Sequence, residues 1–150
     1  MPMSNEMKDA ITEFKKIKPS DCLIDHKQDK PIYTLIKIVG WPSVVHYEFR
    51  YNQLWGLFVE LHIENKIYED LGDTFQRLAN EINVVDGYKV TFSSGGANNP
   101  GPNRKRWPSL SISLGPGILG SKSAVIMNGL INATRPAVTS ALGKWTNDDG

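Results

Sequence analysis

Ionisable and apolar side chains alternate strictly along the segment 57–66, whose sequence is LFVELHIENK. Glu60, His62 and Glu64 occupy every second position, and side chains with this spacing share one face of a strand. Imidazole and carboxylate groups in such a row can bind a metal ion or act as general acids and bases. The row is therefore either a site of chemistry or the solvated face of a strand.

A second row of the same kind lies on the preceding segment 44–51, VVHYEFRY. If the two segments are hairpin partners whose polar rows share a face, each even-numbered polar residue must lie opposite another even-numbered residue. The residue numbers of each opposed pair therefore have an even sum. The register that places opposite charges together pairs Arg50 with Glu60, Glu48 with His62 and His46 with Glu64. The connection is then a longer loop that contains Gln53, Leu54, Trp55 and Gly56.

We interpret the two rows as a cross-strand charge ladder on an exposed sheet face, since antiparallel sheets commonly leave one face in water. The candidate binding residues of this face are His46, Glu48, Arg50, Glu60, His62 and Glu64. Two alternatives stay open: a ligand or protein partner docks there, or all of these residues except the arginine hold zinc or a non-haem metal. Ligands on one strand lie about 6.5–7 Å apart, so a metal also needs ligands from the neighbouring strand. Because the rows lack the spacing of a zinc signature, we assign no metal ion and no cofactor.

An E-x-K triplet, Glu64-Asn65-Lys66, ends the first row, and Glu48 lies on the preceding strand segment. Metal-dependent nucleases of the restriction-endonuclease-like class carry an acidic residue on one strand and E-x-K on the next. In that chemistry carboxylates hold Mg²⁺ and the lysine lies near the attacking water. A metal-dependent nuclease or hydrolase that uses the Glu-His-Glu strand face is therefore an alternative function. We favour the simpler interpretation of a solvated strand end that leads into a helix.

The strongest local charge feature is a basic loop, GPNRKRWPS, in which Arg104, Lys105 and Arg106 precede Trp107. Arginine and lysine neutralise phosphates, and a tryptophan ring can stack on a base. Residues 103–107, joined by Lys122 at the start of the last helix, are thus a candidate site for weak nucleic-acid binding. The alternative is a solvated loop whose tryptophan folds back on the core.

Two further patterns resemble functional motifs less closely. Gly115 and Gly120 have the glycine spacing of a phosphate-binding loop, but Ser121 intervenes before Lys122, so we exclude nucleotide hydrolysis. Binding of an anion by the backbone amides at the start of this helix stays open as an alternative. We favour the interpretation of the segment as a glycine-rich connector. Cys22, near Asp25 and His26, is interpreted as part of a connector.

Periodicity predicts the elements that position these residues. Apolar stripes predict three helices, capped by Ser4, by Asn65, and by Ser121 or Ser123. The third helix should run towards Trp145, and Pro136 should kink or interrupt it. Alternation predicts five strands, at 32–39, 44–51, 57–64, 87–94 and 107–115. The last strand turns Leu110, Ile112 and Leu114 to one side.

The resulting order is α-β-β-β-α-β-β-α, and three consecutive strands with short links favour an antiparallel meander. We therefore expect an α+β fold, a two-layer sandwich in which a mainly antiparallel five-stranded sheet carries helices on one face. The expected core residues are Phe14, Leu71, Phe75, Leu78, Ile131 and Leu142.

Length and composition limit the class of protein. A chain of 150 residues fits one domain, with an ordered core at about 4–145 and a frayed tail at 146–150. The net charge of +1 excludes an acidic DNA mimic and a surface that is basic throughout. A single cysteine, no apolar signal segment and no apolar run of about 20 residues lead us to expect a cytoplasmic protein without a membrane span.

The order strand, GLFVELHIEN, helix, VTFSS, loop, RKRWPSLSISL and then IMNGLINATRPAVTSAL resembles an uncharacterised bacterial domain family. Members of that family are often found C-terminal to restriction-endonuclease-like nuclease domains. The resemblance covers about residues 32–145 and implies an accessory module, without catalytic residues, linked to bacterial or phage defence. This chain departs from that context because no nuclease domain is attached to it.

The expected function is thus a non-enzymatic accessory or binding module rather than an enzyme. Its partner is unknown, and a protein that docks on the polar sheet face is one candidate. Weak nucleic-acid binding by the basic loop and metal-dependent hydrolysis by the Glu-His-Glu strand face are the alternative functions.

Overall fold

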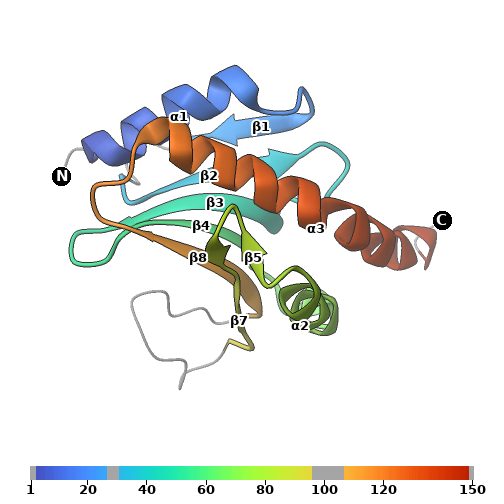
Figure 1. The fold of residues 1–150 in the computed structure, drawn as a ribbon. Helices are drawn as coiled ribbons and strands as arrows, with labels where there is room; N and C mark the ends of the chain where they lie inside the picture. Colours follow the sequence, from blue (N-terminus) through green and yellow to red (C-terminus); the bar gives the residue numbers. More distant parts are fainter. Residues whose placement is uncertain (1–2, 27–30, 96–106, 149–150) are drawn as a thin grey trace.

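The computed structural model describes residues 3–26, 31–95 and 107–148. Over these residues the chain forms a six-stranded antiparallel sheet whose one face carries the helices, so the predicted two-layer α+β class is confirmed (Figure 1). The strands of this sheet are β1 (Cys22–Asp25), β2 (Tyr33–Ile38), β3 (Val45–Asn52), β4 (Gly56–Ile63), β7 (Thr91–Ser93) and β8 (Ser109–Gly115).

The strand order is β1-β2-β3-β4-β8-β7, so β3 and β4 are the two central strands. The first four strands form the predicted meander, and the chain then crosses by way of a helix to β7 and β8. The sheet has one more strand than predicted, because β1 lies in a stretch that reads as a polar connector. Cys22 pairs with Ile38 at the edge of the sheet, and its buried side chain adds to the core.

A small second sheet explains why the predicted strand at 87–94 is divided. Its strands are β5 (Val84–Val85) and β6 (Tyr88–Lys89), joined at Asp86 and Gly87, which both have positive φ. That backbone conformation is typical of a tight hairpin turn. The amide of Val90 then donates to the carbonyl of Asn83 at 2.9 Å, so the chain joins the main sheet only from β7 onward.

Three α-helices and one 3₁₀ turn occur among the described residues: α1 (Asn5–Ile17), η1 (Lys66–Tyr68), α2 (Leu71–Ile82) and α3 (Gly120–Asp148). Ser4 caps α1 as predicted, its hydroxyl accepting from the amide of Met7 at 3.1 Å. Asn65 caps η1 rather than α2. Helix α3 passes through Pro136 without a break and includes residues 146–148, which the sequence predicts to be frayed; residues 149–150 lie outside the described residues.

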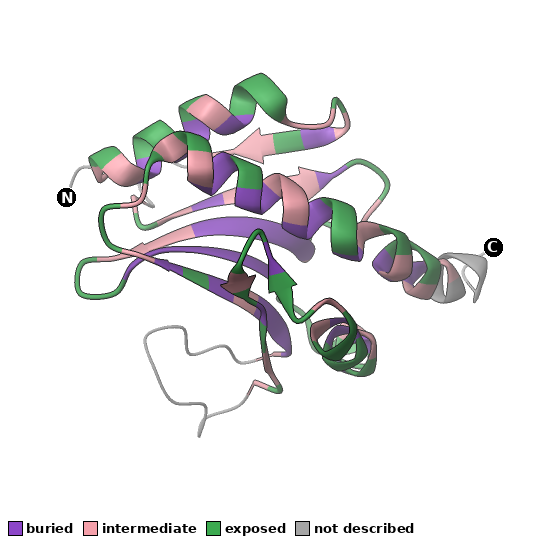
Figure 2. Ribbon diagram, in the orientation of Figure 1, coloured by how far each residue is buried: buried purple, intermediate pink, exposed green. Residues whose placement is uncertain are grey.

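The apolar core lies between the sheet and the helices, where buried segments of α1 and α3 face the strands (Figure 2). Phe14 of α1 meets Phe49 of β3 edge to face, with ring centroids 5.6 Å apart. On α3, Thr134 approaches Tyr47 of β3, and their hydroxyl oxygens are 2.6 Å apart. All six predicted core residues are buried, from Phe14 to Leu142. The helices therefore occupy one face of β3 and β4 and leave the polar rows on the other.

Candidate metal centre

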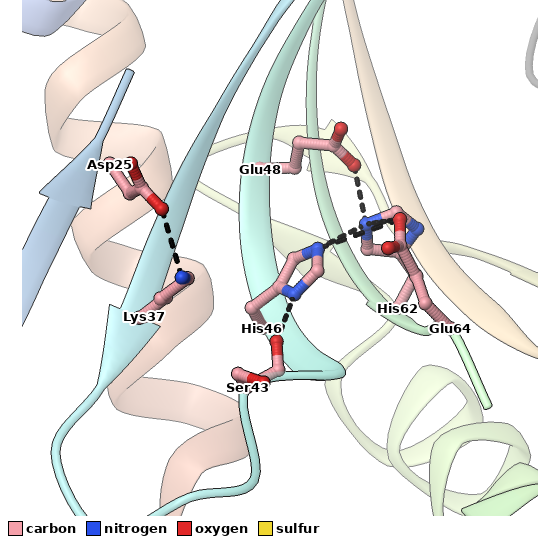
Figure 3. Close-up of polar contacts among 7 residues, drawn as sticks. All are labelled: Asp25, Lys37, Ser43, His46, Glu48, His62 and Glu64. Atoms are coloured by element: carbon pink, nitrogen blue, oxygen red, sulfur yellow. Dashed lines mark hydrogen bonds and ion pairs between the residues drawn. The ribbon is translucent and has the colours of Figure 1, made fainter. Parts of the chain in front are cut away.

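The two central strands each carry an H-x-E triplet, His46-Tyr47-Glu48 on β3 and His62-Ile63-Glu64 at the end of β4. His46 is paired with His62 in the antiparallel ladder. Each glutamate follows its histidine by two residues, so the two triplets are related by the local two-fold symmetry of the strand pair. The four side chains converge on the face of the sheet opposite the helices (Figure 3).

The observed register differs from the predicted one by a shift of two residues along one strand. His46 faces His62 and Glu48 faces Glu60, whereas charge pairing predicted Glu48 opposite His62 and His46 opposite Glu64. The reason lies in the connecting loop, in which Asn52 pairs with Gly56. The side-chain oxygen of Asn52 accepts from the amides of Leu54 and Trp55, and the φ of Gly56 is +85°. This short loop sets the register and still keeps both polar rows on one face.

The expectation that this face is exposed is wrong for most of its residues. His46, Glu48, Glu60 and His62 are at most 3% exposed, whereas Arg50 is half-buried and Glu64 is exposed. The buried side chains belong to central strands, so each is flanked on the same face by residues of neighbouring strands. Leu35 of β2, for example, lies opposite Glu48, and Ser109 of β8 lies opposite His62.

The ligand atoms of the two triplets form a tight cluster. The Nε2 atoms of His46 and His62 are 2.8 Å apart, and Oε2 of Glu48 is in close contact with Nε2 of His62. Oε1 of Glu64 lies 3.6 Å from Nε2 of His62 and 3.8 Å from Nε2 of His46. All four ligand atoms lie within 4.8 Å of one another.

A backbone contact orients the ring of His46. Its Nδ1 lies 2.8 Å from the carbonyl oxygen of Ser43, and because a carbonyl only accepts, Nδ1 carries the hydrogen. Burial, followed by the charge of His62, lowers the pKa of His46 below its usual range, so the ring is neutral at pH 7. Nε2 of His46 therefore points its lone pair at the cluster, as metal-binding histidines held by such a second contact do.

Two neighbours compete for one ring nitrogen of His62. A ring nitrogen offers either one hydrogen or one lone pair, so Nε2 of His62 can form a full two-centre hydrogen bond with only one neighbour. Nevertheless it is in contact with both Nε2 of His46 and Oε2 of Glu48. A cation at the centre of the cluster would instead accept lone pairs from all of these atoms at once.

The size of the cluster fits a zinc-class ion. Zinc–nitrogen bonds of about 2.0–2.1 Å imply ligand atoms roughly 3.3 Å apart in a tetrahedral site. The separations of 2.8, 3.6 and 3.8 Å involving the two imidazoles and Glu64 lie on both sides of that value. The four atoms together span up to 4.8 Å, so the side chains must close around an ion to form the site.

The other predicted site residues are distributed differently. Glu60, opposite Glu48, is outside the group of four, and half-buried Arg50 carries no metal-ligating atom. Lys66 is exposed at the start of η1, so the E-x-K triplet supplies only Glu64 to the cluster. The basic residues 104–106 lie outside the described residues, and nucleic-acid binding by that loop stays a prediction. Trp107 is half-buried and packs on the core, while Lys122 forms an ion pair with Asp86.

Sequence reasoning named all four residues of the cluster but missed the role of Ser43. Its contribution comes from a backbone carbonyl, which no side-chain pattern reveals. The available signal was the turn Pro42-Ser43 just before His46, where the carbonyl of Pro42 accepts from the amide of Val45 at 3.0 Å. That turn places the next carbonyl against the imidazole.

Comparison of the chain with protein-family models, with curated proteins and with solved structures finds no match. The resemblance to a restriction-associated domain family therefore stays a prediction. In the part of the chain that the structure describes, no helix has both the length and the hydrophobicity needed to cross a bilayer.

Proposed function

We propose that the protein is a metal-binding module that holds one divalent transition-metal ion of the zinc class between β3 and β4. The observation that carries this proposal is the convergence of four ligand atoms from His46, Glu48, His62 and Glu64 within 4.8 Å. It deepens the expectation of a binding module by naming what is bound.

Charge supports a cation at this position. Imidazole binds a metal in its neutral form, so in a loaded cluster the ligand charge is that of the Glu48 and Glu64 carboxylates, which a divalent ion balances. Glu48 and both histidines are buried, and a charge removed from water is tolerated when it is paired or coordinates a metal. The four residues are thus better matched to a cation than to an anionic ligand.

The donor set also selects among cations. Two imidazole nitrogens suit zinc, copper, nickel, cobalt or iron, whereas magnesium and calcium prefer sites made entirely of oxygen. The centre should therefore discriminate strongly against Mg²⁺, which separates this proposal from the magnesium-dependent nuclease alternative.

Equilibrium dialysis against Zn²⁺ at pH 7.5, followed by elemental analysis, tests the proposal. Wild type should retain one zinc per chain, and His46→Ala and His62→Ala should retain far less. His26→Ala is the matched control, because His26 lies outside the cluster and contacts the hydroxyl of Thr34 at 2.8 Å. A wild type that retains no zinc, or histidine variants that all behave alike, would contradict metal binding at this site.

A further inference from the structure

The ligand that differs from the other three is Glu64. His46, Glu48 and His62 are buried within the central strands, whereas the side chain of Glu64 is 52% exposed. Its Oε1 lies 3.6 and 3.8 Å from the two Nε2 atoms, which are themselves 2.8 Å apart. The cluster therefore consists of three enclosed ligands and one at its solvent side.

The backbone places Glu64 at the boundary of the sheet. Its amide still donates to the carbonyl of Val44 at 2.8 Å, but β4 has ended and the chain leaves through η1. Almost all residues from 64 to 70 are exposed. The carboxylate can consequently move into water without disturbing the ladder.

The donor set supports an open position. Structural zinc sites are usually closed by cysteine sulfur, whereas two histidines and one glutamate with a water in the fourth position form a catalytic type of site. Cys22 cannot close this centre, because it pairs with Ile38 and is buried with the core on the helix side of the sheet. The three enclosed residues thus match a site that keeps one position free for an exogenous ligand.

We propose that the position occupied by Glu64 is exchangeable, and that the bound metal there takes a small monoanionic oxygen donor of the hydroxide, carboxylate or hydroxamate class. This inference rests on the proposed metal binding. The charge of the ligand follows from the enclosed residues: imidazoles ligate in their neutral form, so a divalent ion held by His46, His62 and the Glu48 carboxylate keeps one positive charge. A monoanion neutralises that charge, as Glu64 itself does when it is bound.

The cobalt form of the full chain provides the test, since Co²⁺ accepts similar ligands and its visible absorption reports changes in coordination. Acetohydroxamate is the probe, titrated into wild type, Glu64→Ala and Glu48→Ala. Glu69→Ala is the control, because Glu69 is an exposed carboxylate of the same connecting segment and is not one of the four ligands. Cobalt affinity is measured separately by competition with a chelator.

Acetohydroxamate should change the spectrum of the wild-type cobalt protein, and Glu64→Ala should bind the probe severalfold more tightly because no carboxylate competes. Glu64→Ala should lose less than about tenfold in cobalt affinity, and Glu48→Ala far more. The inference fails if cobalt binds but the probe changes the spectrum of neither wild type nor Glu64→Ala. It also fails if Glu64→Ala loses cobalt as fully as Glu48→Ala. In both cases the site is closed, while metal binding stands. If wild type binds no cobalt, metal binding itself fails.

Discussion

His46 and His62 are directly opposed in the β3–β4 ladder, and their Nε2 atoms lie 2.8 Å apart on the face of the sheet away from the helices. Both rings come from central strands, and His62 is paired with His46 on one side and with Ser109 of β8 on the other. Two imidazoles placed in this way can share one ion without rearrangement of the sheet. The proposed metal centre therefore depends on the strand register.

Metal binding should stabilise the fold, because the ligands come together only in the native state. A ligand that binds the native state alone stabilises it by about 2.7 kcal/mol at a concentration of 100 times Kd. We expect Zn²⁺ and Co²⁺ to raise the melting temperature of protein stripped with a chelator, and Mg²⁺ to leave it unchanged. Scanning calorimetry with each ion measures this; equal shifts with Mg²⁺ and Zn²⁺ would contradict an imidazole-based site.

The hydroxyl pair between sheet and α3 gives a prediction about stability alone. Thr134 donates to the carbonyl of Leu130 at 2.7 Å, so the hydroxyl of Tyr47 must be the donor to Thr134. Thr134→Val leaves the buried Tyr47 hydroxyl without this acceptor and should lower the free energy of unfolding by about 1–3 kcal/mol. Tyr47→Phe removes the buried hydroxyl instead and should lower it by about 0.5–1.5 kcal/mol.

Urea denaturation of both variants and of the double variant measures these changes and the coupling between the two residues. Zinc stoichiometry serves as the control, since both hydroxyls lie on the helix side of the sheet and the centre lies on the other. Additive effects of the two substitutions would show that the hydroxyls do not interact.

A pH-dependent contribution is expected from the ion pair between Asp21, before β1, and Arg135 of α3. Nη1 of Arg135 donates to Oδ1 of Asp21 at 2.9 Å, and Nη2 donates to Oδ2. This hydrogen bond is the main cause that lowers the pKa of Asp21 in the folded state. A lowered carboxyl pKa gives stability that is present above the unfolded value of about 3.9 and is lost as pH falls through the folded value.

We therefore expect Asp21→Asn to be less stable than wild type at pH 7, and the difference to shrink when both proteins are measured near pH 3. Urea denaturation at the two pH values, in low salt, is the measurement. An unchanged difference at both pH values would mean that the asparagine acts through packing and not through charge.

The faces of the central strands could be predicted from sequence, but their register and burial could not. Strict alternation in 44–51 and 57–64 is enough to place His46, Glu48 and His62 on one face, because the side-chain period of a strand is two. The register depends on the loop between the strands, which is stabilised by the side chain of Asn52 and by the positive φ of Gly56. This loop is shorter than the one required by the register that pairs opposite charges. Charge pairing is worth too little to override that turn.

Burial of the polar row depends on position in the sheet, which the order of strands along the chain does not reveal. β8 pairs with β4 through a crossover, and this makes β4 a central strand and encloses His62. The edge strand β1 was missed because four residues, Cys22–Asp25, contain only a short apolar run among polar neighbours. The long helix α3 was predictable in type, and of the two effects predicted for Pro136, a kink or a break, the break does not occur.

The nuclease alternative makes a different prediction about metals. With Mg²⁺ we expect no cleavage of DNA or RNA, because Lys66 is exposed and the cluster contains two imidazoles. Incubation of labelled oligonucleotides with the protein and Mg²⁺, Mn²⁺ or Zn²⁺ measures this. Robust Mg²⁺-dependent cleavage that Glu64→Ala abolishes would favour the nuclease over the binding module.

The basic loop is tested by fluorescence anisotropy of a labelled single-stranded oligonucleotide at several salt concentrations. With about three phosphate contacts, the slope of log K against log salt should be near −2. An Arg104/Lys105/Arg106→Ala triple variant should bind far more weakly at low salt. Equal binding by the variant and wild type would remove these residues from any nucleic-acid interface.

X-ray absorption at the zinc edge of the zinc-loaded protein tests the metal centre most directly, because it reports the identity and distance of the atoms bound to the ion. The structure predicts a shell of nitrogen and oxygen at about 2.0–2.1 Å, with the scattering pattern of two imidazoles and no sulfur. His62→Ala should lose one imidazole or the metal altogether, and His26→Ala should match wild type. A shell that contains sulfur, or one without imidazole, would contradict a centre built from His46, Glu48, His62 and Glu64.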